Sequence, residues 1–346
     1  MKSENVNKEI LLSVKDLVVE YTSGGQTVSA VNGVSFDVER MNTLGLVGET
    51  GAGKTSIAKA ILRILPDHAT KRTEGTILFE GEDLLRLSDE KMQTVRGGKI
   101  SMIFQDPMTA LNPVKTVVNQ VAEGLRLHQN MSKQDARNAA IEMLETVGIT
   151  EDRADEYPHQ FSGGMKQRVV IAMALACNPE LLIADEPTTA LDVTIQAQVL
   201  DLIKKLRHDR GTSMVLITHD LGIVADVCDS VAVVYAGEIV EYGSKEDIFD
   251  YATHPYTKGL FAALPDMNHQ SDRLSPIEGL PPDPTNLPEG CAFHPRCPYA
   301  CEECRRTKPT AKEIHPGHFV CCLMSEGQTQ GIPGKNSGAD AARSRK

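Results

Sequence analysis

The chain has 346 residues, which is long enough for one large core with an appendage, or for two domains. Its formal net charge of -11 argues against nucleic acid as the main partner, because duplex-binding proteins usually carry a basic face. The sequence shows no signal-peptide pattern and no apolar run long enough to span a bilayer. We therefore predict a cytoplasmic protein, in which clustered cysteines more often bind metal or react than form disulfides.

The first 250 residues alternate short apolar runs with amphipathic stretches. Three apolar runs predict buried strands of a parallel sheet: "TLGLVG" (43–48), "LLIAD" (181–185) and "SMVLITHD" (213–220). Two stretches predict helices: "KTSIAKAILRIL" (54–65), which ends at a proline, and "TIQAQVLDLIKKLRHD" (194–209). This alternation predicts an α/β fold whose strands are joined by crossover helices.

The remaining segments predict how the chain is divided. Residues from about 106 to 178 are rich in helical periodicity and predict a helical insert between two core strands. Residues 231–245 predict a β-hairpin with Gly237 in its turn. The prolines of "GLPPDPTNLPEG" (279–290) cannot continue a helix or a central strand, so this segment predicts a linker into a cysteine-rich region. The polar tail, residues 326–346, is predicted to be disordered.

A phosphate-binding loop is predicted where the first core strand meets its helix. "GETGAGKT" (48–55) fits the pattern of glycines, lysine and threonine, and it lies between a predicted strand and a predicted helix. The glycines let backbone N–H groups turn toward the β-phosphate, and the helix N-terminus adds positive potential. Lys54 supplies a charge to the phosphates and Thr55 a hydroxyl to Mg²⁺. The predicted nucleotide-binding residues here are Gly48, Glu49, Thr50, Gly51, Ala52, Gly53, Lys54, Thr55 and Ser56.

Two adjacent carboxylates follow another buried strand, in "ELLIADEP" (180–187). Ionised carboxylates at the end of a buried strand are costly unless a cation or a water molecule is there for them to act on. Asp185 suits direct or indirect Mg²⁺ binding. Glu186 suits a general base that polarises water for attack on the γ-phosphate.

The segment "FSGGMKQR" (161–168) resembles the signature motif of ABC ATPases. The other motifs follow in the order of that family: "GETGAGKT", "FQDP", "LLIADEP", "ALD" and "ITHD". The resemblance covers about residues 10–260. It implies a P-loop ATPase with a RecA-like core, an antiparallel β subdomain and a helical subdomain, so residues 1–260 are predicted to form the ATPase domain.

The resemblance also implies that two such domains work as a head-to-tail pair. Ser162, Gly163 and Gly164 would contact the γ-phosphate bound by the partner subunit, again at a helix N-terminus. Gln105 would contact Mg²⁺ or the attacking water and signal to the membrane subunits. The implied magnesium ligands are Thr55, Gln105 and Asp185, and the implied catalytic residues are Glu186, His219 and Gln105.

Three further residues receive roles from the resemblance. Asp192 would lie at the dimer seam, and His219 would contact the γ-phosphate and hold the reaction geometry. Tyr21 stands where the family has an aromatic residue that stacks on adenine, and an ordinary strand residue is the alternative. The signature departs from its commonest form at Phe161 and Met165, but its Ser-Gly-Gly is intact, so we expect an active site.

The C-terminal region resembles an extension found in the ATP-binding subunits of dipeptide and oligopeptide importers, whose close relatives move nickel. The matching residues are Cys291, Phe293, Arg296, Cys297, Pro298, Cys304, His318, Val320 and Cys322. The resemblance implies a [4Fe-4S] cluster on Cys291, Cys297, Cys304 and Cys322. Four thiolates can also hold zinc, which is the main alternative, and unligated thiols or a disulfide are the remaining one. Residues 261–325 are therefore predicted to form a small cysteine-rich metal-cluster lobe.

Four cysteines fall outside that implied ligand set. Cys301 and Cys321 could be spares or could exchange with a ligand, whereas Cys177 and Cys228 are predicted to be small buried apolar residues. A structural role for the cluster is favoured, because the region is too small and polar to form a good core without a metal.

The resemblance implies a machine with several further subunits. These are a second ATPase subunit, identical or homologous, two membrane permeases and an extracytoplasmic binding protein. The chain would lie on the inner face of the cell membrane and power peptide import. The alternatives are nickel import by the same machine, and a soluble ABC protein acting on nucleic acid or ribosomes. The charge disfavours the second alternative, and the sequence shows neither a second cassette nor a coiled-coil insert.

Overall fold

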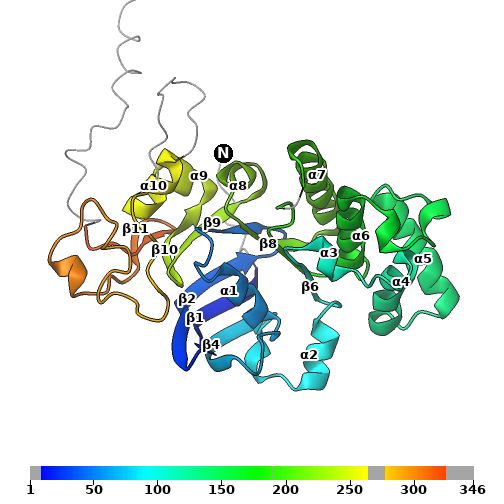
Figure 1. Cartoon of the computed structure of the whole chain (residues 1–346), viewed down its shortest axis with the longest axis horizontal. Helices are drawn as coiled ribbons and strands as arrows, with labels where there is room; N and C mark the ends of the chain where they lie inside the picture. The colour runs from blue at the N-terminus through cyan, green and yellow to red at the C-terminus, as the bar shows by residue number, and fades with distance from the viewer. Residues whose placement is uncertain (1–8, 190, 264–276, 325–346) are drawn as a thin grey trace, which may run out of the picture.

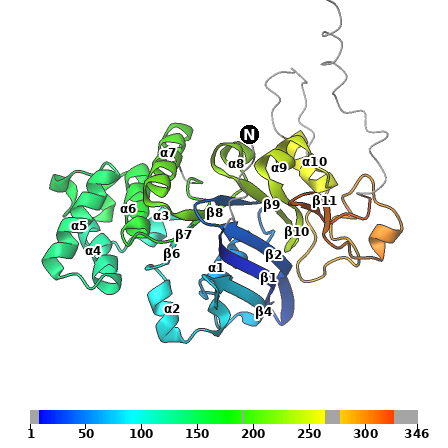
Figure 2. The ribbon, with the colours of Figure 1, turned by 180° about the vertical axis from the view of Figure 1, so that it is seen from behind.

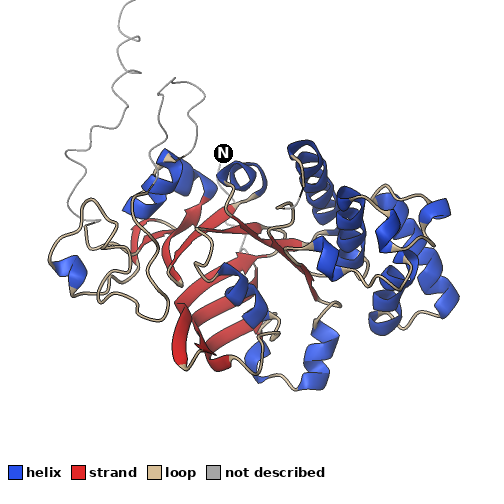
Figure 3. Ribbon diagram, viewed as in Figure 1, coloured by secondary structure: helices blue, strands red, loops and turns tan. Residues whose placement is uncertain are grey.

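The computed structural model of the chain describes residues 9–189, 191–263 and 277–324 (Figure 1). Ala190 of the "ALD" motif, residues 264–276 and the predicted disordered tail lie outside the described residues. The described residues form two sheets and a set of helices that gathers at one end of the molecule (Figure 3).

The larger sheet has the strand order β11-β12-β10-β9-β3-β8-β7-β6. β6, β7, β8, β3 and β9 pair with one another in parallel, and β10, β12 and β11 extend the sheet beyond β9 in antiparallel fashion. The strand bounds are β3 Thr43–Val47, β6 Ile100–Ile103, β7 Leu181–Asp185, β8 Ser213–Thr218, β9 Ser230–Tyr235, β10 Glu238–Ser244, β11 Lys312–His315 and β12 His318–Val320.

The parallel strands confirm the three strand predictions and explain their composition. β3, β7 and β8 are buried along their whole length, which is typical of a parallel sheet covered on both faces. Their carboxyl ends are aligned, because Val47 pairs with Thr218 and Asp185 with Ile217. The segments that follow these strands therefore begin at one edge of the sheet, where open α/β sheets bind their ligands.

The smaller sheet is antiparallel, with the order β2-β1-β4-β5, and agrees with the β subdomain that the resemblance implies. Its strands are β1 Ile10–Ser23, β2 Gln26–Glu39, β4 Thr70–Phe79 and β5 Glu82–Asp83, followed by η1 Leu84–Arg86 and α2 Asp89–Val95. Helix α1 (Lys54–Ile61) packs with this sheet and with side chains of β3 and β8 in one hydrophobic core. The phosphate loop therefore begins a helix that is held between two sheets (Figure 1).

Helix α1 is shorter than predicted, since it ends at Ile61 rather than at Leu65. Arg63 has a left-handed backbone with φ 51, which ends the helix. Its guanidinium donates a hydrogen bond of 2.6 Å to the carbonyl oxygen of Leu87. This tertiary contact is invisible in the local periodicity from which the longer helix was predicted.

The predicted helical insert contains α3 Pro107–Ala110, α4 Val117–His128, α5 Lys133–Thr146, η2 Glu151–Arg153, η3 Pro158–Gln160 and α6 Gly163–Leu175. It lies beyond β6 and β7, away from the smaller sheet (Figures 1 and 2). The remaining core helices are α7 Val193–Arg210 and α8 Leu221–Val227. Helix α7 matches its predicted segment and ends at Gly211, whose φ of 65 suits glycine.

The C-terminal extension is joined to the core sheet. After α9 Lys245–Asp250 and α10 Pro255–Ala262, the described chain resumes at residue 277 and reaches η4 Glu303–Arg305 and then β11. Strand β12 pairs with β10, the second strand of the confirmed β9–β10 hairpin, whose turn contains Gly237 with φ 78. A fully buried side-chain hydrogen bond, between Glu241 Oε1 and His318 Nε2 at 2.9 Å, joins the same two strands. The extension thus continues the ATPase sheet.

Candidate functional site

The phosphate loop leaves β3 and turns into α1 with backbone geometry that only glycine tolerates. Gly53 precedes the helix with φ 99, and a Cβ there would lie 2.2 Å from the carbonyl oxygen of Ala30. Gly51 also has a positive φ, of 83. These two positions leave the loop's backbone N–H groups available at a helix N-terminus, as phosphate binding requires.

Lys54 is buried and crosses back over the loop. Its Nζ donates hydrogen bonds to the carbonyl oxygens of Gly48 at 2.7 Å and Glu49 at 2.8 Å. Burial lowers its pKa, while the nearby carboxylates of Glu186 and Asp185 oppose that shift. The ammonium group is therefore placed inside the loop with the two strand-end carboxylates close to it.

Asp185 lies at the buried end of β7 and has a free coordination position. Burial raises its pKa, and a hydrogen bond from Thr55 opposes the shift. Its Oδ1 is buried and has no hydrogen-bond partner among the described residues. A buried carboxylate oxygen without a partner, next to a threonine hydroxyl, is a fitting donor set for Mg²⁺.

Glu186 is held by three side chains that converge on its carboxylate. Gln105 Nε2 and Thr189 Oγ1 each donate to Oε2 at 2.9 Å, and His219 Nδ1 lies 3.2 Å from Oε1. Burial opposes ionisation, but the hydrogen bonds from Thr189 and His219 outweigh it and hold the pKa of Glu186 below its usual value. The backbone of Glu186 is left-handed, with φ 46, a strained conformation for a non-glycine residue.

The predicted adenine-stacking residue also reaches the loop. Tyr21 lies on β1, and its hydroxyl donates a hydrogen bond of 3.1 Å to Ser56 Oγ in α1. The structure thus brings Tyr21, the phosphate loop, Gln105, Asp185, Glu186 and His219 to one region at the carboxyl edge of the sheet.

The signature segment begins α6, which starts well away from α1 in both views (Figures 1 and 2). Ser162 is the N-cap of α6 and accepts the backbone N–H of Met165. The two unusual signature residues share one partner, since the Arg153 guanidinium lies 4.6 Å from the Phe161 ring centroid and 3.3 Å from Met165 Sδ. Asp192 caps α7 by accepting the Ile195 N–H at 3.0 Å. Ser162, Gly163 and Gly164 thus lie at the start of a helix that is separated from α1 of their own chain.

Five of the C-terminal cysteines are neighbours. Cys291, Cys297, Cys304 and Cys322 lie near enough for their charges to affect one another's pKa, and burial raises the pKa of Cys291 to about 11. Cys301 joins them, with its Sγ 3.3 Å from that of Cys304. Nevertheless, no group of three or more histidine, cysteine or acidic side chains in the described part of the chain has the arrangement of a formed metal site.

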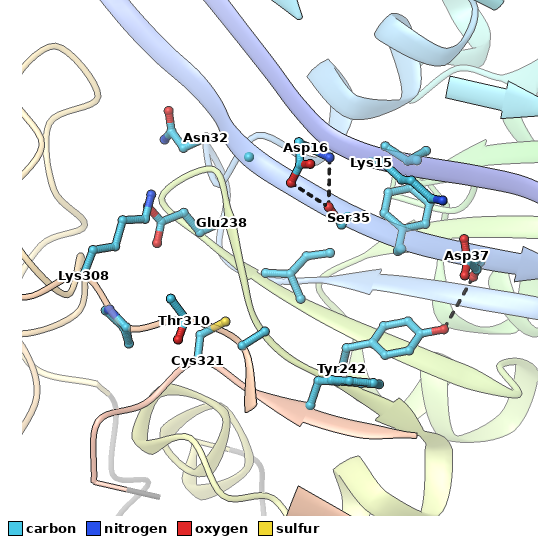
Figure 4. A pocket seen from close by; sticks show the side chains of 17 residues that line it. Lys15, Asp16, Asn32, Ser35, Asp37, Glu238, Tyr242, Lys308, Thr310 and Cys321 are labelled. Atoms are coloured by element: carbon cyan, nitrogen blue, oxygen red, sulfur yellow. Dashed lines mark hydrogen bonds and ion pairs between the residues drawn. The ribbon is translucent and has the colours of Figure 1, made fainter. Parts of the chain in front are cut away.

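The Cys321 side chain faces away from the other five C-terminal cysteines. It lines a groove between the smaller sheet and the extension, together with Asp16, Tyr242, Lys308 and Thr310 (Figure 4). Burial raises its pKa to about 11, and the neighbouring charges are Glu238 and Lys308 in addition to Cys322. Adjacent residues on an extended segment point to opposite sides, which accounts for the separation of Cys321 from Cys322.

Of the two remaining cysteines, Cys228 is buried in the core, as predicted, and Cys177 packs against the core without being fully buried. Cys228 is buried behind β3, where a Cβ on Gly45 would lie 2.9 Å from its sulfur, and burial raises its pKa to about 12. Cys177 is half-buried, and burial likewise raises its pKa. Both behave as small apolar side chains.

The structure adds a contact to which the sequence assigned no role. Arg296, which lies in the motif C-x-F-x-x-R-C-P, forms a bidentate ion pair with Glu49 of the phosphate loop at 2.7 and 3.0 Å. The Tyr256 hydroxyl accepts the backbone N–H of Glu49 at 2.9 Å. No local pattern could pair residues 247 positions apart.

Comparison with known proteins decides the family. Residues 31–189 match the ABC transporter family, and residues 240–304 match the C-terminal region of oligopeptide/dipeptide transporters. The chain is 51% identical to the dipeptide transport ATP-binding protein DppD of Bacillus subtilis, over 92% of this chain and 96% of that protein. It is 46% identical to the oligopeptide transport ATP-binding protein OppD of Escherichia coli, over 91% and 93%.

The chain belongs to the dipeptide and oligopeptide transport ATP-binding proteins of the ABC transporter family. Its fold agrees with solved ABC cassettes. A dimeric cassette bound to ADP and Pi superposes with a TM-score of 0.61 at 28% identity, over 68% of this chain and 98% of that chain.

Membership in this family confirms the predicted ABC-type α/β fold and the ABC ATPase assignment. The roles of the individual residues and the limits of the domains stay predictions. None of the helices in the described ranges is long and apolar enough to cross a membrane.

Proposed function

We propose that this chain is the ATP-hydrolysing subunit that powers import of dipeptides and oligopeptides across the cytoplasmic membrane. One observation carries the proposal: a hydrogen-bonded Glu186 beside a phosphate loop occurs in the same chain as a C-terminal region that matches peptide transporters. Relatives that are 46–51% identical are named as dipeptide or oligopeptide transport ATP-binding proteins.

Nucleotide binding follows from the loop geometry. The backbone N–H groups before α1 and the Lys54 ammonium would bind the phosphates, and Tyr21 would lie against the base. Thr55, Asp185 and Gln105 would hold Mg²⁺, which when bound neutralises the charge that develops on the phosphates. The partnerless Oδ1 of Asp185 supports its part in this ligand set.

Hydrolysis would depend on Glu186 as the base that orients and polarises water. Its carboxylate is ionised at neutral pH, because hydrogen bonds hold its pKa below the usual value. Gln105 and Thr189 bind Oε2, and His219 lies beside Oε1, so the attacking water would approach from the His219 side. The three partners fix the carboxylate before the substrate arrives, so little reorganisation is needed in the transition state.

We propose that two ATPase subunits pair to complete each site. Ser162, Gly163 and Gly164 begin a helix that is remote from the loop of their own chain, so a second subunit would supply them in trans. The similar cassette of known structure is described as dimeric with bound ADP and Pi, which supports this arrangement. ATP binding would close the pair, and hydrolysis would reopen it.

The pair would act beneath two membrane permeases on the inner face of the membrane, with an extracytoplasmic protein delivering the substrate. We propose this layout because the family consists of transporter subunits and the described helices include no candidate span. Nickel is the alternative cargo, and the transport assay described below distinguishes it.

We further propose that Cys291, Cys297, Cys304 and Cys322 hold a [4Fe-4S] cluster, with zinc as the alternative. The donor chemistry fits, since the four thiols lie near enough for their charges to affect one another's pKa. The thiols would have to approach one another on metal binding, because in this structure they are not arranged as a formed site. When bound, the metal would stabilise a segment with little apolar core.

One purification tests the proposed function. The chain is isolated anaerobically with its membrane partners, analysed for iron, sulfide and zinc, and reconstituted into vesicles. We expect ATP hydrolysis stimulated by peptide and binding protein, together with peptide uptake. Nickel-stimulated uptake, or co-purification with ribosomes in place of permeases, would contradict the assignment.

A further inference from the structure

Arg296 connects the cysteine segment, residues 291–297, to the phosphate loop. Its side chain is only 4% exposed, and NH1 and NH2 contact Glu49 Oε2 and Oε1 at 2.7 and 3.0 Å. A bidentate arginine–carboxylate pair fixes both the distance and the orientation of the two groups. The carboxylate that it fixes belongs to the second residue of the loop that binds phosphate.

The other donors of Arg296 are also engaged. Nε donates to the carbonyl oxygen of Glu278 at 3.0 Å, and NH2 reaches that of Ile277 at 3.3 Å. The guanidinium lies 5.8 Å from the Tyr235 ring centroid. Because the side chain is held on every edge, it provides a fixed anchor for Glu49.

Glu49 is held at three points. Arg296 binds its carboxylate, the Tyr256 hydroxyl accepts its backbone N–H at 2.9 Å, and Lys54 Nζ donates to its carbonyl oxygen at 2.8 Å. Backbone N–H groups can bind a phosphate only when the loop is already in the correct conformation, since reorganising it would weaken binding. Arg296 and Tyr256 therefore fix the conformation on which that binding depends.

The turns that place Arg296 also place the cysteines. His294 N–H donates to Cys291 O at 3.0 Å, Arg296 N–H to Phe293 O at 3.0 Å, and Cys297 N–H to His294 O at 3.4 Å. The buried Phe293 ring packs edge-on against Tyr235, with ring centroids 5.2 Å apart. The Arg296 guanidinium can therefore keep its position only while residues 291–297 are ordered.

We propose that Arg296 is a positioning residue for nucleotide binding, which makes the affinity of the phosphate loop depend on the order of the cysteine segment. This inference rests on the proposed function of the chain as an ATPase. By linkage, nucleotide binding must stabilise the cysteine segment to the same extent that the ordered segment favours nucleotide binding. The cysteine region thereby acts on the motor site as well as on its own stability.

The test compares nucleotide affinity in four full-length variants, with Mg²⁺ and a fluorescent ATP analogue as the probe. Arg296→Gln is expected to weaken binding about tenfold, because the loop loses its anchor. Glu49→Gln weakens binding less, and the double variant remains as weak as Arg296→Gln. Arg306→Gln is the control, since Arg306 is an exposed arginine paired with Glu302 in the same region, and it changes affinity less than about twofold.

Two results would overturn the inference. One is unchanged affinity in Arg296→Gln. The other is wild-type affinity in the double variant, which would mean that Arg296 only neutralises the Glu49 charge. If Arg296→Gln does not fold, Glu49→Gln decides the matter, because it removes the bidentate ion pair while leaving the cysteine segment its own contacts, and unchanged affinity in Glu49→Gln would then overturn the inference. A wild-type chain that binds no nucleotide would instead overturn the proposed function itself.

Amide hydrogen exchange tests the coupling separately. If Arg296 only stabilised its own surroundings, nucleotide would not change the exchange of the cysteine segment. Saturating nucleotide is expected to slow exchange of the amides in residues 291–297 of the wild-type chain and to have little effect on them in Glu49→Gln. Equal protection in both proteins, or none in the wild-type protein with nucleotide bound, would contradict coupling through the Arg296–Glu49 pair.

Discussion

The Glu186 carboxylate lies 3.2 Å from His219 Nδ1, across the carboxyl ends of the adjacent parallel strands β7 and β8. Each residue is the first after its strand, so the parallel register brings together two side chains that are 33 positions apart in the sequence. The left-handed φ of Glu186 turns its carboxylate toward the site at a cost in backbone strain.

Glu186→Gln is expected to lower ATP hydrolysis by about 10²- to 10⁴-fold while ATP binding is retained. The amide has the same shape and still has an oxygen that can accept from Gln105 and Thr189, but it cannot act as a base. The closed, ATP-bound dimer should accumulate. Phosphate release and size-exclusion chromatography with ATP measure the two effects. Glu246→Gln, on the exposed face of α9, is the control, and rapid hydrolysis by Glu186→Gln would exclude the role proposed for Glu186.

The two signature glycines offer a matched pair. A Cβ at Gly163 would lie 4.0 Å from the Leu191 side chain, whereas a Cβ at Gly164 would lie 2.7 Å from Ile195 Cγ2. Gly163→Ala should therefore fold normally, and Gly164→Ala should be less stable than Gly163→Ala by about 1–3 kcal/mol. Chemical denaturation measures this difference.

ATP hydrolysis by the Gly163 variant tests whether this glycine contacts phosphate, which the stability measurement does not address. If the signature approaches the partner's γ-phosphate, Gly163→Ala should lower hydrolysis at least about tenfold despite its normal stability. Full hydrolysis by Gly163→Ala would show that this glycine makes no close contact in the closed dimer.

Neighbouring cysteines should differ in metal binding. Cys322 lies with the other thiols, whereas Cys321 lines the groove shown in Figure 4. Cys322→Ser is expected to abolish the iron and sulfide content of anaerobically purified protein, and Cys321→Ser to preserve it. Elemental analysis and the absorption spectrum measure both. Equal loss in the two variants would contradict the ligand set, and zinc in place of iron would identify the alternative metal.

Acid should destabilise the protein through His254. Its side chain is 1% exposed, and burial together with the charge of Lys258 lowers its pKa from 6.5 to about 3. The unfolded chain therefore takes up a proton as pH falls below about 6.5, and the folded protein does not. The stability that the neutral histidine contributes is complete above pH 6.5 and is lost progressively toward pH 3, by up to about 1.4 kcal/mol per pH unit.

His254→Asn isolates this effect. Asparagine can still cap α10 by accepting the Tyr256 N–H, as His254 Nδ1 does at 3.1 Å, but it does not titrate. The free energy of unfolding of the variant should fall less steeply between pH 6.5 and pH 4. An identical pH slope in the two proteins would rule out His254 as the source.

The nucleotide site could be predicted from sequence because its parts are local. Each motif is a short run at the end of a strand or the start of a helix, and parallel strands bring their carboxyl ends to one edge. The same logic predicted the β9–β10 hairpin from Gly237. It failed at the end of α1, where a contact from Arg63 to a distant loop decided the boundary.

The sequence by itself determined the strands, the phosphate loop, the strand-end carboxylates and the resemblance to the family, because spacing and composition carry that information. Only the tertiary structure decided that Arg296 holds Glu49, that β12 continues the ATPase sheet and that Cys321 turns away from the other thiols. These relationships join segments up to 247 positions apart. They arise from packing and sheet register, which no short window of sequence encodes.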